Sequence, residues 1–208
     1  MRKTQVILIS AILAVISAAT NATTKGLNQI VTPDVQPYGV VSISVQGQHP
    51  AIGNGLMLQT EIGLTKNFEI AAFYGLRPGL SVLNAEYALV QKGDTLLSAG
   101  FTSWTTSGNG PQPFLEGGYN HGRQKYTLGI MHVGNRNLEA ILGAAYQVNP
   151  KLLLQADYQS GSENFSTVGF TVNLTDTLTL NPSIYVANSS DHSLYGYAVL
   201  AWNFTGWK

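Results

Sequence analysis

The sequence carries a recurring set of polar side chains that could act together in an enclosed space. Between about residues 39 and 204, apolar and polar residues alternate with a period of two, which predicts strands with two different faces. One face carries the carboxylates Glu61, Glu86, Glu116, Glu139 and Asp157. The same face carries the amides Gln59, Asn84, Asn120 and Gln155. Carboxylates that line a narrow passage favour cations and repel anions.

The distance of each carboxylate from the predicted turns indicates how the group is arranged. Glu61, Glu86 and Glu116 precede short turns by about five residues, and Asp157 follows one by about six, so we expect these four at similar heights. Glu139 should lie near the opposite rim. The pattern predicts an acidic belt on the wall of a pore. The alternative is that these side chains, with the four amides as partners, only fill and hydrate the interior.

Twelve candidate strands must position these side chains. They cover about residues 39–48, 56–65, 68–76, 81–91, 95–105, 113–121, 125–133, 138–148, 151–159, 165–174, 178–187 and 193–204. Every second connection is a tight turn such as "TKN", "KGD" or "NPK", in which Asn, Gly and Pro favour the required backbone. Most other connections are longer. Consecutive hairpins would therefore have short turns on one rim and longer loops on the other.

The opposite face of these strands is apolar and almost free of charge, and four features favour contact of this face with lipid. Most basic residues fall in turns, whereas solvated strands usually carry lysine. Glycine is frequent on the polar face, as suits a crowded inner wall. Tyrosines lie towards strand ends, as in interfacial aromatic belts, and strands of about ten residues can cross an apolar band at a tilt. A secreted β-sandwich is the alternative, because its strands alternate too.

The N-terminus has the features of a secretory signal peptide. Arg2 and Lys3 precede an apolar stretch that is too short to span a membrane as a helix, followed by small residues at Ser17-Ala18-Ala19. We expect cleavage after Ala19 or Ala22. The predicted organisation is therefore a signal peptide at 1–22, an extended lead-in with two prolines at 23–38, and a β-barrel at 39–208.

Composition and motifs exclude several other classes of function. The chain has no cysteine, 11 basic and 11 acidic residues, and only 11% charged residues, so we expect neither a disulfide nor nucleic-acid binding. The histidine spacing suggests no metal site, and no cofactor motif is present. Asp191-His192-Ser193 contains the residue types of a hydrolase, but adjacent residues form no catalytic relay. We therefore predict that the protein is not an enzyme and uses no cofactor.

The stretch from about 39 to 204 resembles bacterial outer-membrane β-barrels of the porin-like type. The resemblance rests on hairpins such as "GLTKNFEIA" and on the terminal strand "LYGYAVLAWNF". It implies an all-β, antiparallel, up-and-down transmembrane β-barrel of about 12 strands in the bacterial outer membrane, in contact with lipid and with the outer-membrane assembly machinery. Such barrels usually end in an aromatic residue, whereas this chain ends in Lys208.

The function that this resemblance and the polar face predict is a narrow pore or transporter for small neutral or cationic solutes. Twelve strands give a backbone radius of roughly 12 Å, which side chains reduce to a passage of a few Å. The alternative is a non-conducting structural outer-membrane protein or the secreted β-sandwich. The oligomeric state stays open.

Overall fold

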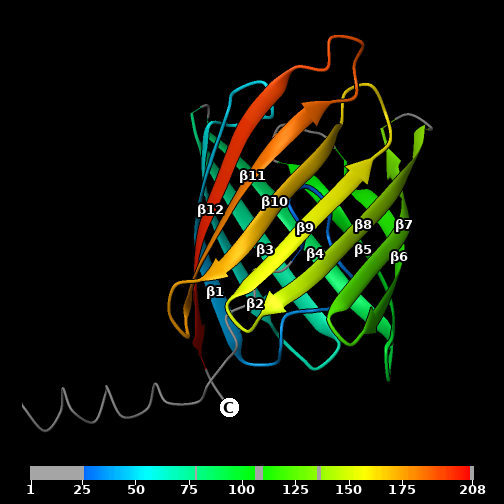
Figure 1. Cartoon of the computed structure of the whole chain (residues 1–208), viewed down its shortest axis with the longest axis vertical. Helices are drawn as coiled ribbons and strands as arrows, with labels where there is room; N and C mark the ends of the chain where they lie inside the picture. Colours follow the sequence, from blue (N-terminus) through cyan, green and yellow to red (C-terminus); the bar gives the residue numbers. More distant parts are fainter. Residues whose placement is uncertain (1–25, 78, 106–109, 135–136, 207–208) are drawn as a thin grey trace, which may run out of the picture.

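The structure is a computed structural model, and it describes residues 26–77, 79–105, 110–134 and 137–206 (Figure 1). The predicted signal peptide at 1–22 lies outside these ranges, as does Lys208. Within the described ranges, no helix is long and apolar enough to cross a membrane.

Twelve antiparallel strands form one closed barrel. They are β1 (Val40–Gln48), β2 (Leu56–Gly63), β3 (Phe68–Leu76), β4 (Gly79–Lys92), β5 (Thr95–Thr105), β6 (Gln112–His121), β7 (Gln124–Val133), β8 (Asn137–Asn149), β9 (Leu152–Gln159), β10 (Phe165–Asn173), β11 (Leu178–Ala187) and β12 (Leu194–Thr205). Each strand pairs with the next along the chain, and β1 pairs with β12 from Val40↔Thr205 to Gln48↔Tyr197. This closure confirms the predicted up-and-down barrel of twelve strands and rules out the β-sandwich.

The two rims of the barrel differ as the sequence predicts. The turns after β2, β4, β8 and β10 lie on the lower rim in Figure 1, where β12 also ends. The longer connections after β1, β9 and β11 rise above the upper rim. We call these the turn rim and the loop rim. The even number of strands places the beginning of β1 and the end of β12 together on the turn rim.

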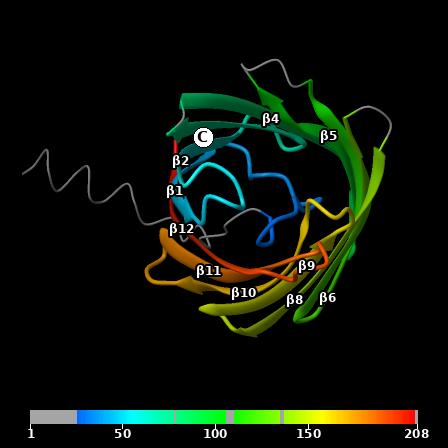
Figure 2. The same cartoon turned by 90° about the horizontal axis from the view of Figure 1, so that it is seen from above.

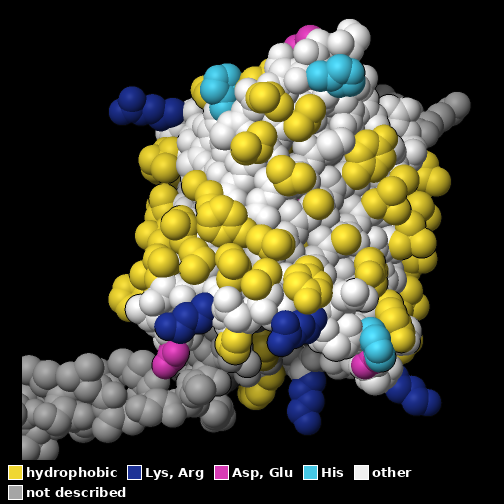
Figure 3. Space-filling view, viewed as in Figure 1, with side chains coloured by type: hydrophobic (Ala, Val, Ile, Leu, Met, Phe, Trp, Pro, Cys, Tyr) yellow, Lys and Arg dark blue, Asp and Glu magenta, His cyan; other side chains and the backbone are white. Residues whose placement is uncertain are grey.

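The outer wall of the barrel is apolar. Leucine, isoleucine, valine and aromatic side chains of the strands are exposed, with Leu128 at 65% and Val168 at 56%. On the face that Figure 3 shows, they spread over the wall between the two rims, and Lys and Arg gather towards the lower rim. The predicted apolar face therefore points outward and the polar face points into the lumen.

At two places in the wall, the alternation of apolar and polar residues does not predict which side chains point outward. In β12, where both faces look apolar, Leu194 and Trp202 are exposed while Tyr197 and Val199 point inward. In β4, a shift of register between Ala88 and Val90 leaves consecutive residues of the strand on the outside. A β-bulge of this kind interrupts the period of two.

A pair of equally exposed leucines tests whether the outer band contacts hydrocarbon. Leu128 lies near the middle of β7 and is 65% exposed, while Leu138 lies at the loop-rim end of β8 and is 64% exposed. Leu128→Arg should lower the free energy of unfolding from lipid vesicles by about 2–4 kcal/mol, and Leu138→Arg by at most about 1 kcal/mol. Denaturant titration in vesicles, followed by tryptophan fluorescence, measures both. Equal losses would contradict a membrane-spanning band.

Candidate functional site

The inner wall carries all nine side chains that the sequence predicts to line it. The five carboxylates are buried from bulk solvent, as is Gln155, and Gln59, Asn84 and Asn120 are half-buried. Their inward orientation agrees with the alternation of the strands. Their part in conduction stays a prediction.

Three carboxylates come together on one side of the lumen. Glu61, Glu69 and Glu86 lie on the consecutive strands β2, β3 and β4 and line the same cavity. Glu69 is directly opposite Glu86 in the strand register. Like charges in facing positions repel each other, and the preference for cations that the sequence predicts for these carboxylates stays a prediction.

The other three carboxylates contact different partners. Glu139 Oε2 accepts hydrogen bonds from Gln159 Nε2 at 2.7 Å and from Asn164 Nδ2 at 2.8 Å, close to the loop rim. Ser98 Oγ donates to Glu116 Oε1 at 3.4 Å. Asp157 binds the N-terminal part of the chain, as described below. The expected belt at one height stays a prediction.

The interior of the barrel is occupied by residues 26–38, which we call the lumen segment. Figure 2 shows this segment, in blue, inside the ring of strands. It has no helix and no strand beyond an isolated bridge between Tyr38 and Gly63. The sequence predicts an extended lead-in here but contains no signal that would place it in the lumen.

Asn28 is the principal polar contact between the lumen segment and the wall. Its backbone N–H donates to Asp157 Oδ2 at 2.7 Å, and its side-chain Nδ2 donates to Thr167 Oγ1 at 2.9 Å. Gln155 Nε2 donates to Asn28 Oδ1 at 2.7 Å, and the Tyr185 hydroxyl donates to the Asn28 carbonyl. Asn28 thus satisfies its own polar groups while bridging three strands, β9, β10 and β11.

Further contacts hold the rest of the lumen segment. Ile30 is buried in an apolar cluster with Phe114, Met131 and Ile141. The backbone N–H of Gln36 donates to a carboxylate oxygen of Glu69. The segment therefore combines polar anchors at both ends with an apolar contact between them.

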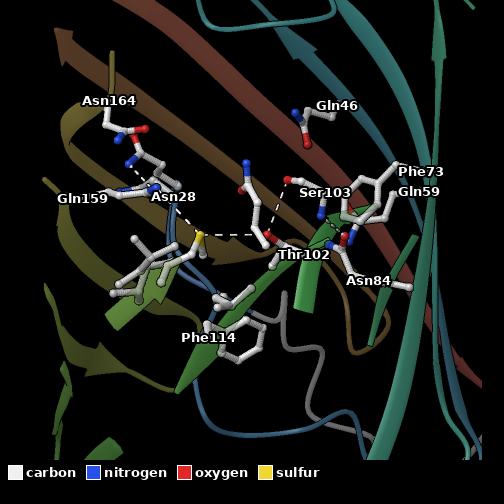
Figure 4. Close-up of a pocket in the computed structure, with 18 of the residues that line it drawn as sticks. Asn28, Gln46, Gln59, Phe73, Asn84, Thr102, Ser103, Phe114, Gln159 and Asn164 are labelled. Carbon is white, nitrogen blue, oxygen red and sulfur yellow. Dashed lines mark hydrogen bonds between the residues drawn. The ribbon is translucent and has the colours of Figure 1, made fainter. Parts of the chain in front are cut away.

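The lumen segment lies between two cavities. The outer cavity, of about 460 Å³, opens towards the loop rim, and the inner cavity, of about 370 Å³, lies towards the turn rim. Gly26 and Leu27 line both. Figure 4 shows the outer cavity, with Gln59 and Asn84 on one wall facing Asn28 and Gln159 across the space.

The sequence Asp191-His192-Ser193 forms a loop turn rather than a relay. Ser189 and Ser193 both donate to the Asp191 carboxylate, and these bonds keep the pKa of Asp191 below its usual value. His192 Nδ1 instead approaches the Ala187 carbonyl oxygen at 3.3 Å. Among the described residues, no group of three or more His, Cys, Asp or Glu side chains is placed to hold a metal ion.

A closed antiparallel barrel with an apolar exterior and a polar interior is a porin-like β-barrel, and solved structures of this class are similar to the chain. The KdgM porin has a TM-score of 0.60 at 11% identity, covering 78% of this chain and 98% of that one. The NanC porin has a TM-score of 0.55 at 7% identity, covering 79% and 98%. No protein-family model and no curated protein matches the sequence. At these identities the similarity concerns the fold.

A structure of the KdgM porin in complex with disordered oligogalacturonate is similar as well. It has a TM-score of 0.57 at 11% identity and covers 79% of this chain and 98% of that chain.

The separation of the two cavities can be tested by cysteine labelling, because the chain has no native cysteine. Gln59 lines the outer cavity and Asn120 the inner one. If the loop rim faces outward, a bulky, membrane-impermeant maleimide added to intact cells should label Gln59→Cys and leave Asn120→Cys unlabelled. Both variants should react in detergent solution, which controls for thiol reactivity. Equal labelling in intact cells would show that the lumen segment does not separate the cavities.

Proposed function

We propose that the protein is a narrow pore of the bacterial outer membrane for small neutral or cationic solutes. The observation that carries the proposal is the distribution of charge. Six carboxylates face the lumen from the strands, at Glu61, Glu69, Glu86, Glu116, Glu139 and Asp157. Of the described basic side chains, Lys125 and Lys151 line the inner cavity, and none lines the outer cavity.

The membrane setting is supported by the outer wall and by the similar folds. An exposed apolar band around a closed barrel is unfavourable in water and favourable in lipid. A barrel also satisfies every backbone hydrogen bond of its strands within the wall, as hydrocarbon requires. The expected signal peptide agrees with export from the cytoplasm.

Solute selectivity follows from the lumen of this chain rather than from its structural relatives. One similar porin is described in complex with oligogalacturonate, whose sugar units carry carboxylates. The carboxylates of β2, β3 and β4 in this chain would repel such a polyanion at the outer cavity. Amide side chains such as Gln59 and Asn84 beside them can hydrogen-bond neutral polar solutes.

A non-conducting structural barrel is the second candidate, and the lumen segment favours it, because the segment fills part of the passage. Current recordings distinguish the two functions. The folded protein in planar lipid bilayers should give discrete channel steps, which become more frequent when the lumen segment is loosened by Asn28→Ala. The absence of steps from both proteins would contradict the pore and favour the structural function.

Charge removal tests the selectivity. Glu61→Gln with Glu86→Gln removes two carboxylates from the outer cavity and should lower the ratio of cation to anion permeability by roughly two- to fivefold, the effect of losing about 0.5–1 kcal/mol of attraction. Reversal potentials in a salt gradient measure the ratio. Asp94→Asn with Asp176→Asn removes two exposed charges from the turn rim and is the matched control. Equal effects of the two pairs would exclude a selective role for Glu61 and Glu86.

A further inference from the structure

We propose that the lumen segment is a tethered plug, which holds the barrel closed and leaves the lumen to let solutes pass. The inference rests on the proposed pore function and concerns its regulation. Four observations carry it: how the segment is attached, how the wall fits it, where it lies, and how it is held.

Among the described residues, the backbone–backbone hydrogen bonds that join the lumen segment to the sheet lie at its C-terminal end, whereas side chains hold the rest of it. Gly39 N–H donates to the Gly63 carbonyl at 2.9 Å and Val40 N–H to the Pro37 carbonyl at 3.0 Å, where the chain enters β1. Near the N-terminal end of the segment, the Leu27 N–H donates to the Ile30 carbonyl, so this backbone hydrogen bond lies within the segment and does not join it to a strand. Withdrawal would therefore leave the hydrogen-bond ladders of all twelve strands intact.

Glycines of the inner wall make room for the segment. A Cβ atom at Gly118 would lie 2.6 Å from Pro33 Cγ, and one at Gly143 would lie 2.5 Å from Leu27 Cδ1. Gly63 and Gly169 approach the segment just as closely. A side chain at Gly63 would meet backbone atoms of Gln36 and Pro37, so the segment could not stay in place there. The wall is thus shaped to accept this stretch of the chain.

The position of the lumen segment makes it an obstruction. It passes between the outer and inner cavities and contributes residues to both. Asn28 lies against β9, β10 and β11, and Gln36 contacts Glu69 on β3 across the lumen. The chain therefore crosses the passage from wall to wall.

The contacts of the segment are of a reversible kind. They include hydrogen bonds of Asn28 and Gln36, whose net free energies are small because water replaces them when they break. The ion pair between Lys125 Nζ and Asp34 Oδ2, at 3.7 Å, is half exposed and contributes little. The apolar contact is small: Ile30 enters the buried cluster, and Leu27 and Val31 pack against it while partly exposed. Such a segment behaves as an intramolecular ligand of the lumen. The fraction of molecules in which the segment is bound there equals the fraction of pores that are closed.

Loosening the plug should open the pore. Asn28→Ala removes the two side-chain hydrogen bonds to Thr167 and Gln155 and should raise the open probability roughly tenfold in single-channel recordings. Asn181→Ala is the matched control: Asn181 is a buried inner-wall asparagine whose Nδ2 donates to Thr171 Oγ1 at 2.9 Å, the same length as the Asn28–Thr167 bond. This control should leave the open probability within about twofold of the original. Circular dichroism and protease resistance verify that both variants fold.

Locking the plug should close the pore again. Pro33→Cys removes the Cγ atom that a Cβ at Gly118 would meet, so Pro33→Cys with Gly118→Cys places two cysteines side by side and can pin the segment to β6 by a disulfide. In the Asn28→Ala background, oxidation should return the open probability to the original level or below, and a reductant should restore opening. Each single cysteine variant should be insensitive to both treatments.

The outcomes separate the plug from the pore. Channels whose open probability responds neither to Asn28→Ala nor to the cross-link would overturn the plug and leave the pore function standing. The absence of channels from every variant, with folding verified, would overturn both. Opening by Asn28→Ala that the disulfide reverses is the result that the plug requires.

Discussion

The whole structure depends on the closure of the sheet between β1 and β12. A strand edge in hydrocarbon would leave backbone N–H and C=O groups without partners, at a cost of several kcal/mol for each group. The pairing of Val40 with Thr205 through to Gln48 with Tyr197 removes that edge. Closure also fixes the two faces of every strand, so apolar residues such as Leu128 point outward and polar residues such as Glu116 point inward. Everything proposed for the lumen follows from this division.

A closed barrel of twelve strands has an interior that side chains alone do not fill, and the chain places its own N-terminal residues there. The lumen segment meets a wall that is complementary in two ways. Polar side chains such as Asp157 bind its backbone, and glycines such as Gly118 leave space for its bulk. The carboxylates of β2, β3 and β4 line the outer cavity. One lumen thus contains both the acidic outer cavity and the lumen segment, and the proposed pore and plug are two aspects of it.

Much of the fold could be predicted from the sequence, because alternation is a local property. All twelve predicted strands are confirmed, with boundaries within two residues of the prediction. The inward orientation of Glu61, Glu86 and Asp157 follows from the same pattern. Alternation failed where it was locally disturbed, as at the bulge beside Val90, at Ser103, which lines the lumen together with its neighbour Thr102, and in β12, where Tyr197 and Leu200 are both apolar enough for either face. Counting residues from the predicted turns did not reveal that Glu69 lies opposite Glu86. Which residues lie opposite each other is decided by the pairing register of neighbouring strands.

The sequence by itself determined which residues form strands, which face of each strand is apolar, and that the polar face carries carboxylates. These features depend on a period of two, which is a property of residues that are neighbours in the chain. Only the tertiary structure decided what occupies the lumen. Asn28 meets Asp157 and Tyr185 more than a hundred residues further along the chain. The two prolines in "LNQIVTPDVQPY" indicate an extended chain but carry no information about a partner so far away. Contacts of this kind arise when the sheet closes and encloses a space, and no local pattern describes that space.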